Sequence, residues 1–236
     1  MLRLCNVSFY YTTYRLFSTY KKQVLRHVNL ELTANSSLAI MGKNGSGKST
    51  LAKIICGLLQ PNIDENGSLG EVKFYSKALQ IDSLEARRRF YAEVQILFQD
   101  CIGSLNPHFT CLENCFEPLT YLTTCSKDEG MERIIALSSD LGLPTGILDK
   151  QISSISGGEA QRICLIRALS IMPKILILDE SLSGLDYELS MAVIGFLKRW
   201  QRQNNGSILL ITHNENIAYA LCDSVRILND NGNLQE

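Results

Sequence analysis

The stretch GKNGSGKST, residues 42–50, has the spacing G-x-x-x-x-G-K-[ST]. Its glycines let the backbone turn N–H groups inward around phosphate oxygens, and a helix that follows adds its positive N-terminal end. Lys48 would then reach the β- and γ-phosphates, and the Ser49 hydroxyl would bind Mg²⁺. An ordinary glycine turn is the alternative, but an apolar strand before the stretch and a helical pattern after it favour a nucleoside triphosphate site. The candidate contacts are Gly42, Lys43, Asn44, Gly45, Ser46, Gly47, Lys48, Ser49 and Thr50.

Two carboxylates end the apolar run ILILDE, residues 175–180. Asp179 is placed to hold Mg²⁺, and Glu180 is placed to polarise an attacking water as a general base. An apolar strand can also end in acidic residues for solubility alone. Because that alternative must explain the pair alongside the phosphate loop, we interpret the two carboxylates as catalytic.

Gln99 and His213 each follow a predicted strand, after VQILF and SILLIT respectively. At the carboxyl ends of strands in an open α/β sheet, side chains point towards the ligand crevice. Either residue can equally be an ordinary loop residue, so position alone leaves both interpretations open.

A second pair of glycines occurs in SISGGEAQR, residues 154–162, where a helical pattern begins. Like the first stretch, it predicts a turn whose backbone N–H groups can bind phosphate. The candidate contacts are Ser156, Gly157, Gly158 and Glu159. The stretch contains no lysine, however, so it is a poor phosphate site by itself.

The positions of these residues depend on the surrounding elements. Alternating apolar and polar residues predict two half-buried strands, 2–11 and 23–32. The basic and aromatic stretch between them, residues 12–22, predicts a long hairpin loop, with nucleic-acid binding as a minor alternative. Residues 110–170 show helical periodicity, with a helix end near Asp140 because Pro144 cannot continue one. Further strands are predicted at residues 37–41, 71–75, 95–98, 175–179 and 207–212. Strands and helices alternate around a helical insertion, which predicts an α/β fold with a parallel core sheet.

Composition narrows the class of protein. The 236 residues suffice for one large domain, and 45% of them are apolar. The formal charge of −1, from 23 basic and 24 acidic side chains, predicts no field that attracts nucleic acid or anionic lipid. The sequence shows neither a secretory signal nor an apolar run as long as a membrane span, so we expect a soluble cytosolic protein.

The eight cysteines have irregular spacing, and several lie in apolar patterns, so we expect free, buried thiols. The spacing of His108, Cys111 and Cys115 can align ligands on one face of a helix. No second cluster completes a metal site, and we therefore predict core packing for this group and no metal.

Taken in order, these motifs resemble the nucleotide-binding subunits of ATP-binding cassette (ABC) transporters over nearly the whole chain. The resemblance makes Gln99 the glutamine loop, SGGE at residues 156–159 the signature, and His213 the switch histidine. SGLD at residues 183–186 also falls at a family-like spacing. The resemblance implies ATP and Mg²⁺ as cofactors, and catalytic roles for Glu180, His213 and Gln99. The implied Mg²⁺ ligands are Ser49, Gln99 and Asp179.

The resemblance also implies an aromatic side chain that stacks on adenine. Tyr11 occupies that position, with its neighbours Tyr10 and Phe9 as alternatives. The implied architecture is one nucleotide-binding domain, residues 1–236, with a parallel-sheet core lobe and an N-terminal antiparallel β part. A helical subdomain that carries the signature is inserted in the core at about residues 101–170.

Two subunits of that family pack head to tail, and each signature closes on the γ-phosphate held by the other's phosphate loop. The resemblance therefore assigns Ser156, Gly157, Gly158 and Glu159 to the partner's ATP, which explains the missing lysine. Glu159 departs from the family, which most often has glutamine. Glutamate accepts hydrogen bonds from ribose hydroxyls but cannot donate one, and it adds negative charge, so we expect function with weaker closure.

The motif SLNP, residues 104–107, and the long stretch 12–22 are similar to the nickel and oligopeptide importer subfamily. The implied function is an ATPase subunit that energises import of nickel, metal chelates or short peptides, peripheral at the cytoplasmic face of the inner membrane. The implied partners are a second ATPase subunit (a related chain or a second copy), two permease subunits and, indirectly, an extracytoplasmic substrate-binding protein.

Other functions remain as alternatives. An exporter or lipoprotein-release ATPase is the nearest one, and SLNP argues against it. A soluble ABC ATPase that acts on nucleic acid usually has a coiled-coil insertion or a second cassette, which this sequence lacks, so no nucleic-acid partner is expected. A regulatory module without turnover is argued against by the intact Glu180 and His213.

Overall fold

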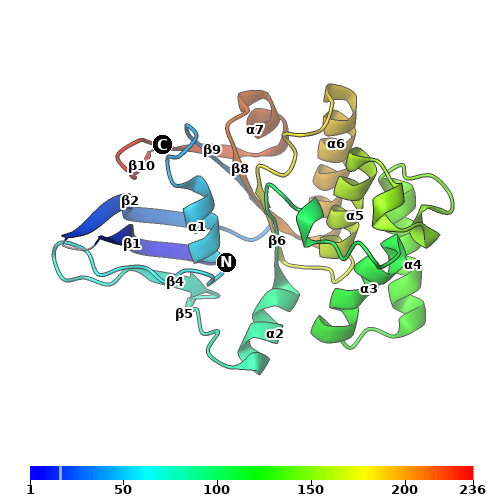
Figure 1. Cartoon of the computed structure of the whole chain (residues 1–236), viewed down its shortest axis with the longest axis horizontal. Helices are drawn as coiled ribbons and strands as arrows, with labels where there is room; N and C mark the ends of the chain where they lie inside the picture. Colours follow the sequence, from blue (N-terminus) through cyan, green and yellow to red (C-terminus); the bar gives the residue numbers. More distant parts are fainter. Residues whose placement is uncertain (16–17, 236) are drawn as a thin grey trace. The chain divides into compact units, whose positions relative to one another are not determined.

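The computed structural model describes residues 1–15 and 18–235, and the chain divides into two units (Figure 1). The first unit combines Met1–Ile81 with Leu209–Glu236, and the second is Asp82–Ile208. The phosphate loop and His213 belong to the first unit. Gln99, the two carboxylates and the signature belong to the second.

The first unit contains a four-stranded antiparallel sheet in the order β2-β1-β4-β5. Its strands are β1 (Leu2–Arg15), β2 (Ser18–Leu32), β4 (Glu71–Phe74) and β5 (Lys77–Ala78). The N-terminal antiparallel β part is therefore confirmed, and so is the strand predicted at residues 71–75, which ends one residue earlier.

The prediction of a long hairpin loop at residues 12–22 is wrong. Strands β1 and β2 extend to Arg15 and from Ser18 as a paired ribbon, with Thr12 opposite Lys21 and Thr13 opposite Tyr20 (Figure 1). Tyrosine and threonine favour extended backbone, and cross-strand contacts stabilise it without burial. Leu16 and Phe17, which belong to the same predicted loop, lie outside the described residues.

The first unit also contains parallel strands. Strand β3 (Ser37–Met41) pairs in parallel with β9 (Ser224–Leu228), whose other edge pairs with the antiparallel β10 (Leu234–Gln235). Helix α1 (Lys48–Ile55) follows β3 through the glycine stretch, and α7 (Glu215–Leu221) packs on β3 and β9. Strand β8 (Ser207–Thr212) ends in this unit, immediately before His213.

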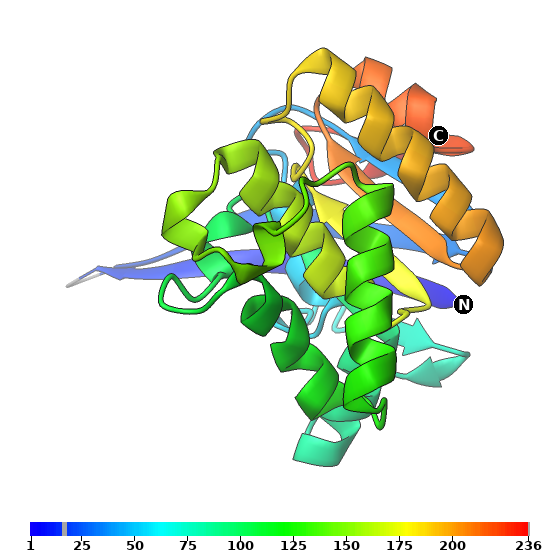
Figure 2. The ribbon, with the colours of Figure 1, turned by 90° about the vertical axis from the view of Figure 1, so that its right-hand side faces the viewer.

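The second unit contains the parallel pair β6 (Val94–Leu97) and β7 (Ile175–Asp179) and most of the helices. Helices α3 (Cys111–Leu122), α4 (Lys127–Asp140) and α5 (Gly157–Leu169) pack against one another, as Figure 2 shows in green and yellow-green. The helical periodicity predicted for residues 110–170 is thus confirmed. Two further helices are α2 (Leu84–Glu93) and α6 (Tyr187–Asn204).

Each of the helices α3, α4 and α5 begins with a capping box. A serine or threonine before the first turn accepts the N–H of a glutamate three residues later, whose carboxylate binds back to the cap. The caps are Thr110, Ser126 and Ser156. The helix starts are therefore encoded locally, and one of the three lies within the signature.

The buried strands form the cores. Every residue of β3, β7 and β8 is buried, as their uninterrupted apolar runs predict. Cys111 and Cys115 are buried in α3, which confirms their predicted core packing, and burial raises the pKa of the Cys115 thiol far above its ordinary value. His108 is exposed.

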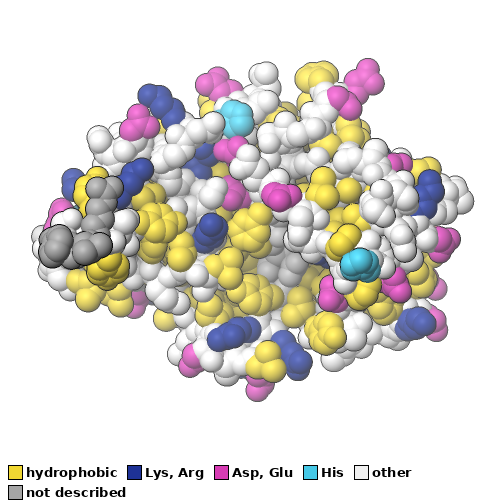
Figure 3. Space-filling view, viewed as in Figure 1, with side chains coloured by type: hydrophobic (Ala, Val, Ile, Leu, Met, Phe, Trp, Pro, Cys, Tyr) yellow, Lys and Arg dark blue, Asp and Glu magenta, His cyan; other side chains and the backbone are white. Residues whose placement is uncertain are grey.

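Charged side chains are dispersed over the surface that Figure 3 draws. Basic groups in dark blue and acidic groups in magenta are interspersed there, in agreement with the formal charge of −1. Among the described residues, no helix combines the length and the apolar character that a membrane crossing requires.

Candidate functional site

The phosphate-loop candidates lie between the end of β3 and the start of α1, as predicted. Lys48 begins the helix, and its side chain is turned back into the loop, where the residue is only 4% exposed. Its ammonium donates hydrogen bonds to the carbonyl oxygens of Gly42 at 2.8 Å and Lys43 at 3.0 Å. The loop therefore surrounds a buried cation before any ligand is considered.

Two of the loop glycines are required by close packing. A Cβ on Gly42 would lie 2.4 Å from the carbonyl oxygen of Leu228, and one on Gly47 would lie 2.6 Å from Cγ1 of Val24. Gly47 also has φ 104°, a conformation that side chains disfavour. The tight turn of this loop thus depends on residues without side chains, which is why the motif fixes glycine at both positions.

One further observation indicates that the loop can bind a triphosphate. The Ser46 hydroxyl is buried, and it has no hydrogen-bond partner among the residues that the structure describes. An unpaired buried hydroxyl is costly, and an anionic oxygen in the loop would satisfy it. Ser49 stands in the first turn of α1, directly after Lys48, and is exposed.

Tyr11 is anchored beside the start of α1. Its hydroxyl lies 3.3 Å from Oγ1 of Thr50, and its ring meets Phe9 edge-on at 5.0 Å between centroids. With 43% of the residue exposed, part of the ring remains open to a ligand. The candidate adenine-stacking residue and the candidate phosphate loop are therefore brought together within the first unit.

His213 follows β8 and is exposed. The next residue, Asn214, caps α7 by accepting the N–H of Ile217 at 3.2 Å, and its own N–H donates to the Thr212 hydroxyl at 3.0 Å. These hydrogen bonds fix the backbone on both sides of the histidine.

The second unit brings two other candidates to one edge of its parallel pair. Leu97 of β6 is in register with Leu178 of β7, and Gln99 and Glu180 each stand two residues beyond that pair. Parallel strands end at a common edge, so the predicted position of Gln99 and Glu180 after strand ends is confirmed, whereas their contact with a ligand stays a prediction. Asp179 is the last residue of β7 and is only 2% exposed.

Glu180 begins a tight turn. Its backbone has φ 52°, and its carbonyl oxygen accepts the N–H of Ser183 at 3.2 Å and the Ser183 hydroxyl at 2.7 Å. Asp186 then caps α6 by accepting the N–H of Leu189 at 2.8 Å. The SGLD stretch is thus a structured turn that joins the carboxylate strand to the helix.

The signature residues form the capping box of α5. The N–H and the hydroxyl of Ser156 both donate to the Glu159 carboxylate at 2.8 Å. The Ser156 backbone hydrogen bond, followed by that of the hydroxyl, lowers the pKa of Glu159. A Cβ on Gly157 would meet no other part of the described structure within 4 Å, so there is space for a side chain at this glycine. The predicted contact of Glu159 with a partner's ribose stays a prediction, and the structure adds a cap that glutamine can also provide.

Two residues that sequence reasoning missed hold the segment after Gln99. Asn114 is fully buried; its side chain accepts the N–H of Asn106 at 2.8 Å and donates to the carbonyl oxygens of Asn106 and Thr110. Arg167 of α5 donates to the Ser104 carbonyl oxygen at 2.8 Å. The SLNP motif is thereby attached to α3 and to the helix that begins with the signature. A buried asparagine within an apolar helix pattern was the available signal.

Ser181, the residue after Glu180, was also missed. Its hydroxyl is buried and has no hydrogen-bond partner among the residues described. We expect Ser181→Ala to raise the free energy of unfolding by about 1 kcal/mol, because it removes a buried unpaired group. The matched variant Ser170→Ala should lower it by about 1 kcal/mol, since that hydroxyl donates to the Arg167 carbonyl oxygen at 3.0 Å. Urea denaturation of both variants checks this, and equal losses of stability would contradict it.

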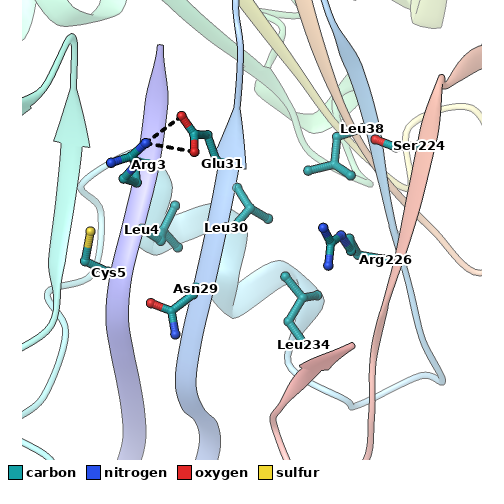
Figure 4. A pocket seen from close by; sticks show the side chains of 10 residues that line it. All are labelled: Arg3, Leu4, Cys5, Asn29, Leu30, Glu31, Leu38, Ser224, Arg226 and Leu234. Atoms are coloured by element: carbon teal, nitrogen blue, oxygen red, sulfur yellow. Dashed lines mark hydrogen bonds and ion pairs between the residues drawn. The ribbon is translucent and has the colours of Figure 1, made fainter. Parts of the chain in front are cut away.

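A cavity of about 470 Å³ in the first unit is separate from these residues (Figure 4). It lies between the β1–β2 ribbon and strands β3 and β9, and no candidate nucleotide contact lines it. Arg3 donates to both carboxylate oxygens of Glu31 at 2.8 Å, and Asn29 is bonded to the backbone of Asn6 and His27 at 2.9 Å. Because these polar groups already have partners, the cavity is not included in the functional site.

The sequence is similar to known transport proteins. The family model described as ABC transporter matches residues 25–183. The nickel import ATP-binding protein NikE of Shigella flexneri is 35% identical over 237 residues, which cover 100% of this chain and 86% of that protein. The protein of the same name from Escherichia coli O157:H7 is 36% identical over 90% of this chain and 77% of its own length.

Solved structures agree with the fold. The dimeric structure of MJ0796, a bacterial ABC transporter cassette, has a TM-score of 0.85 at 26% identity and covers 100% of this chain and 97% of that one. A post-hydrolysis state of MJ0796 bound to ADP and Pi has a TM-score of 0.83 at 27% identity, with the same coverage. The predicted cassette fold is confirmed. The chain therefore belongs to the ABC transporter family, as an ATPase that uses ATP.

Proposed function

We propose that this chain is the ATP-hydrolysing subunit of a membrane importer for nickel. The observation that carries the proposal is the phosphate loop, where the buried ammonium of Lys48 is held by two loop carbonyls beside the unpaired hydroxyl of Ser46. The cargo is supported by relatives named nickel import ATP-binding proteins, which match over 90% to 100% of the chain. Among the cargoes that the sequence left open, these names favour nickel over short peptides.

The residues of the phosphate loop would bind the triphosphate. Lys48 would exchange loop carbonyls for the oxygens of the β- and γ-phosphates, and Ser46 would donate its hydroxyl hydrogen to a phosphate oxygen. Tyr11 would stack on the adenine base. The contact between the Tyr11 and Thr50 hydroxyls holds the Tyr11 ring beside α1. Bound Mg²⁺ would neutralise charge that develops on the phosphate oxygens, and we assign Ser49, Gln99 and Asp179 to hold it.

The proposed hydrolytic step depends on Glu180. Its carboxylate would accept a proton from the attacking water, so that the water oxygen attacks the γ-phosphorus while the bond to ADP breaks. We assign His213 and Gln99 to the same step as polar residues that orient the reacting groups. Support comes from the common strand edge at which Gln99 and Glu180 stand.

The proposed assembly contains more than this chain. The whole chain would act as one nucleotide-binding domain, with a helical subdomain at about residues 101–170 that carries the signature. It would pair with a second ATPase subunit, a related chain or a second copy, on the cytoplasmic face of the membrane beneath two permease subunits. An extracytoplasmic substrate-binding protein would deliver the cargo to those permeases. A cassette relative solved as a dimer supports the pairing.

Lys48→Ala is expected to weaken ATP binding about ten- to a hundredfold and to abolish nickel uptake, because it removes charge-assisted hydrogen bonds to phosphate. The measurement is uptake of radioactive nickel by cells that carry the complete importer but no other nickel uptake system. Lys53→Ala is the matched control, since Lys53 is an exposed lysine of the same helix. Nickel uptake that survives Lys48→Ala would contradict the proposed function, and ATP-dependent uptake of peptides without nickel would contradict the cargo.

A further inference from the structure

Lys21 and Lys22 are neighbours in β2 with different surroundings. The ammonium of Lys21 lies 4.4 Å from the centre of the Tyr10 ring and 3.4 Å from the Tyr10 hydroxyl. The side chain of Lys22 has no hydrogen bond, ion pair or ring contact with any residue in the described part of the chain. One lysine of the pair is thus engaged by the ribbon, and the other presents its charge to solvent.

The register of the ribbon places the two lysines on opposite faces. Lys22 stands directly opposite Tyr11, and Lys21 stands opposite Thr12. Residues directly opposite in an antiparallel pair share a face, with Cβ atoms about 4.5–5.5 Å apart. Lys22 therefore shares the face of Tyr11, and Lys21 shares the face of Tyr10, which the contact between Lys21 and Tyr10 corroborates.

The face that carries Tyr11 and Lys22 is turned to the phosphate loop. The Tyr11 hydroxyl reaches Thr50 of α1 at 3.3 Å. Further along β2, Leu25 is paired with Phe9, whose ring contacts that of Tyr11. A Cβ on Gly47 of the loop would lie 3.2 Å from Cδ2 of Leu25. Strand β2 consequently passes against the loop, and Lys22 is within one side-chain length of Tyr11.

We propose that Lys22 is a further nucleotide-binding residue, which contacts the purine base stacked on Tyr11. The inference rests on the proposed function, because it requires ATP in the phosphate loop. The hydroxyl of Tyr11 meets α1, and Lys22 is paired with the backbone of Tyr11, so Lys22 stands beside the ring on which the base would stack. An ammonium group binds the face of an aromatic system and donates hydrogen bonds to ring nitrogens. Since adenine and guanine offer both features, Lys22 contributes affinity for either base.

The test compares nucleotide binding by the full chain in isothermal titration calorimetry, with ATP and with inorganic tripolyphosphate as probes. Lys22→Ala should weaken ATP binding about three- to tenfold and leave tripolyphosphate binding unchanged. Lys21→Ala removes the same charge from the other face and should bind ATP within about twofold of wild type, and Lys22→Arg should retain affinity. In the background of Tyr11→Ala, the effect of Lys22→Ala should shrink, because both residues hold one base.

Two results would overturn the inference and leave the proposed function intact. One is wild-type ATP affinity in Lys22→Ala while Lys48→Ala loses affinity. The other is an equal loss for tripolyphosphate, which would place Lys22 on the phosphates instead of the base. If Lys48→Ala also binds ATP as tightly as wild type, the phosphate loop itself is misassigned, and both proposals fail.

Discussion

Glu180→Gln is expected to slow ATP turnover about a hundredfold or more and to leave ATP affinity within about twofold. Glutamine has the shape of glutamate, but its amide cannot accept the proton of the attacking water. The turn at residue 180 does not need the carboxylate, because its carbonyl oxygen accepts both the N–H and the hydroxyl of Ser183. The substitution should therefore change the chemistry and preserve the strand end that presents the residue.

The measurement is phosphate release in a single turnover by the assembled transporter, together with ATP affinity. Glu188→Gln is the matched control, because Glu188 is an exposed glutamate in the first turn of α6 and loses the same charge. Turnover near the wild-type rate in Glu180→Gln would remove this residue from the role of general base. Equal slowing in Glu188→Gln would show that charge near the turn, and not the base, is responsible.

Much of the fold was predictable because its signals are local. The buried strand β7 is an uninterrupted apolar run, and helix α5 begins with a capping box that four adjacent residues encode. From such elements the sequence also predicts that Gln99 and Glu180 stand at strand ends. Their common edge follows from the register of Leu97 with Leu178. The chemical roles of these residues are still predictions, and the variant Glu180→Gln described above tests the role of Glu180.

The features that were missed depend on contacts between residues distant in sequence or on burial. Residues 12–15 and 18–22 are polar and aromatic without a burial pattern, and only pairing such as that of Thr13 with Tyr20 makes them a ribbon. Asn114 is buried because it satisfies the backbone of Asn106, and Ser181 is buried without any described partner. Propensity and periodicity do not reveal the partner of a buried polar group, so the position of Asn114 in an apolar helix pattern was a signal for its burial but not for its contacts.

The second large effect of a substitution is expected in the signature, SGGE at residues 156–159, because one of its glycines has space for a side chain. Gly157 is the first residue of α5, and a Cβ there would meet no atom of the described residues within 4 Å, apart from its chain neighbours and the backbone of its own helix. Its own fold therefore tolerates a side chain, and a carboxylate in the first turn of a helix is electrostatically favourable. If the proposed pairing holds, however, that carboxylate would stand against the partner's triphosphate. Like charges brought together in an interface cost several kcal/mol.

Gly157→Asp is accordingly expected to weaken ATP-dependent association with the second ATPase subunit about tenfold or more, with unchanged stability of the isolated chain. The pair is trapped with Glu180→Gln and the equivalent change in the partner, and association is measured by sedimentation with and without ATP. Gly157→Ala, which adds a methyl group without charge, should retain most of the association. The Ser156 N–H and hydroxyl donate to Glu159 within their own chain, so the signature alone should bind nucleotide poorly. The N–H groups of Gly157 and Gly158, in the first turn of α5, would contact a phosphate that the partner's phosphate loop already holds. Association undiminished by Gly157→Asp would mean that SGGE serves only to begin helix α5.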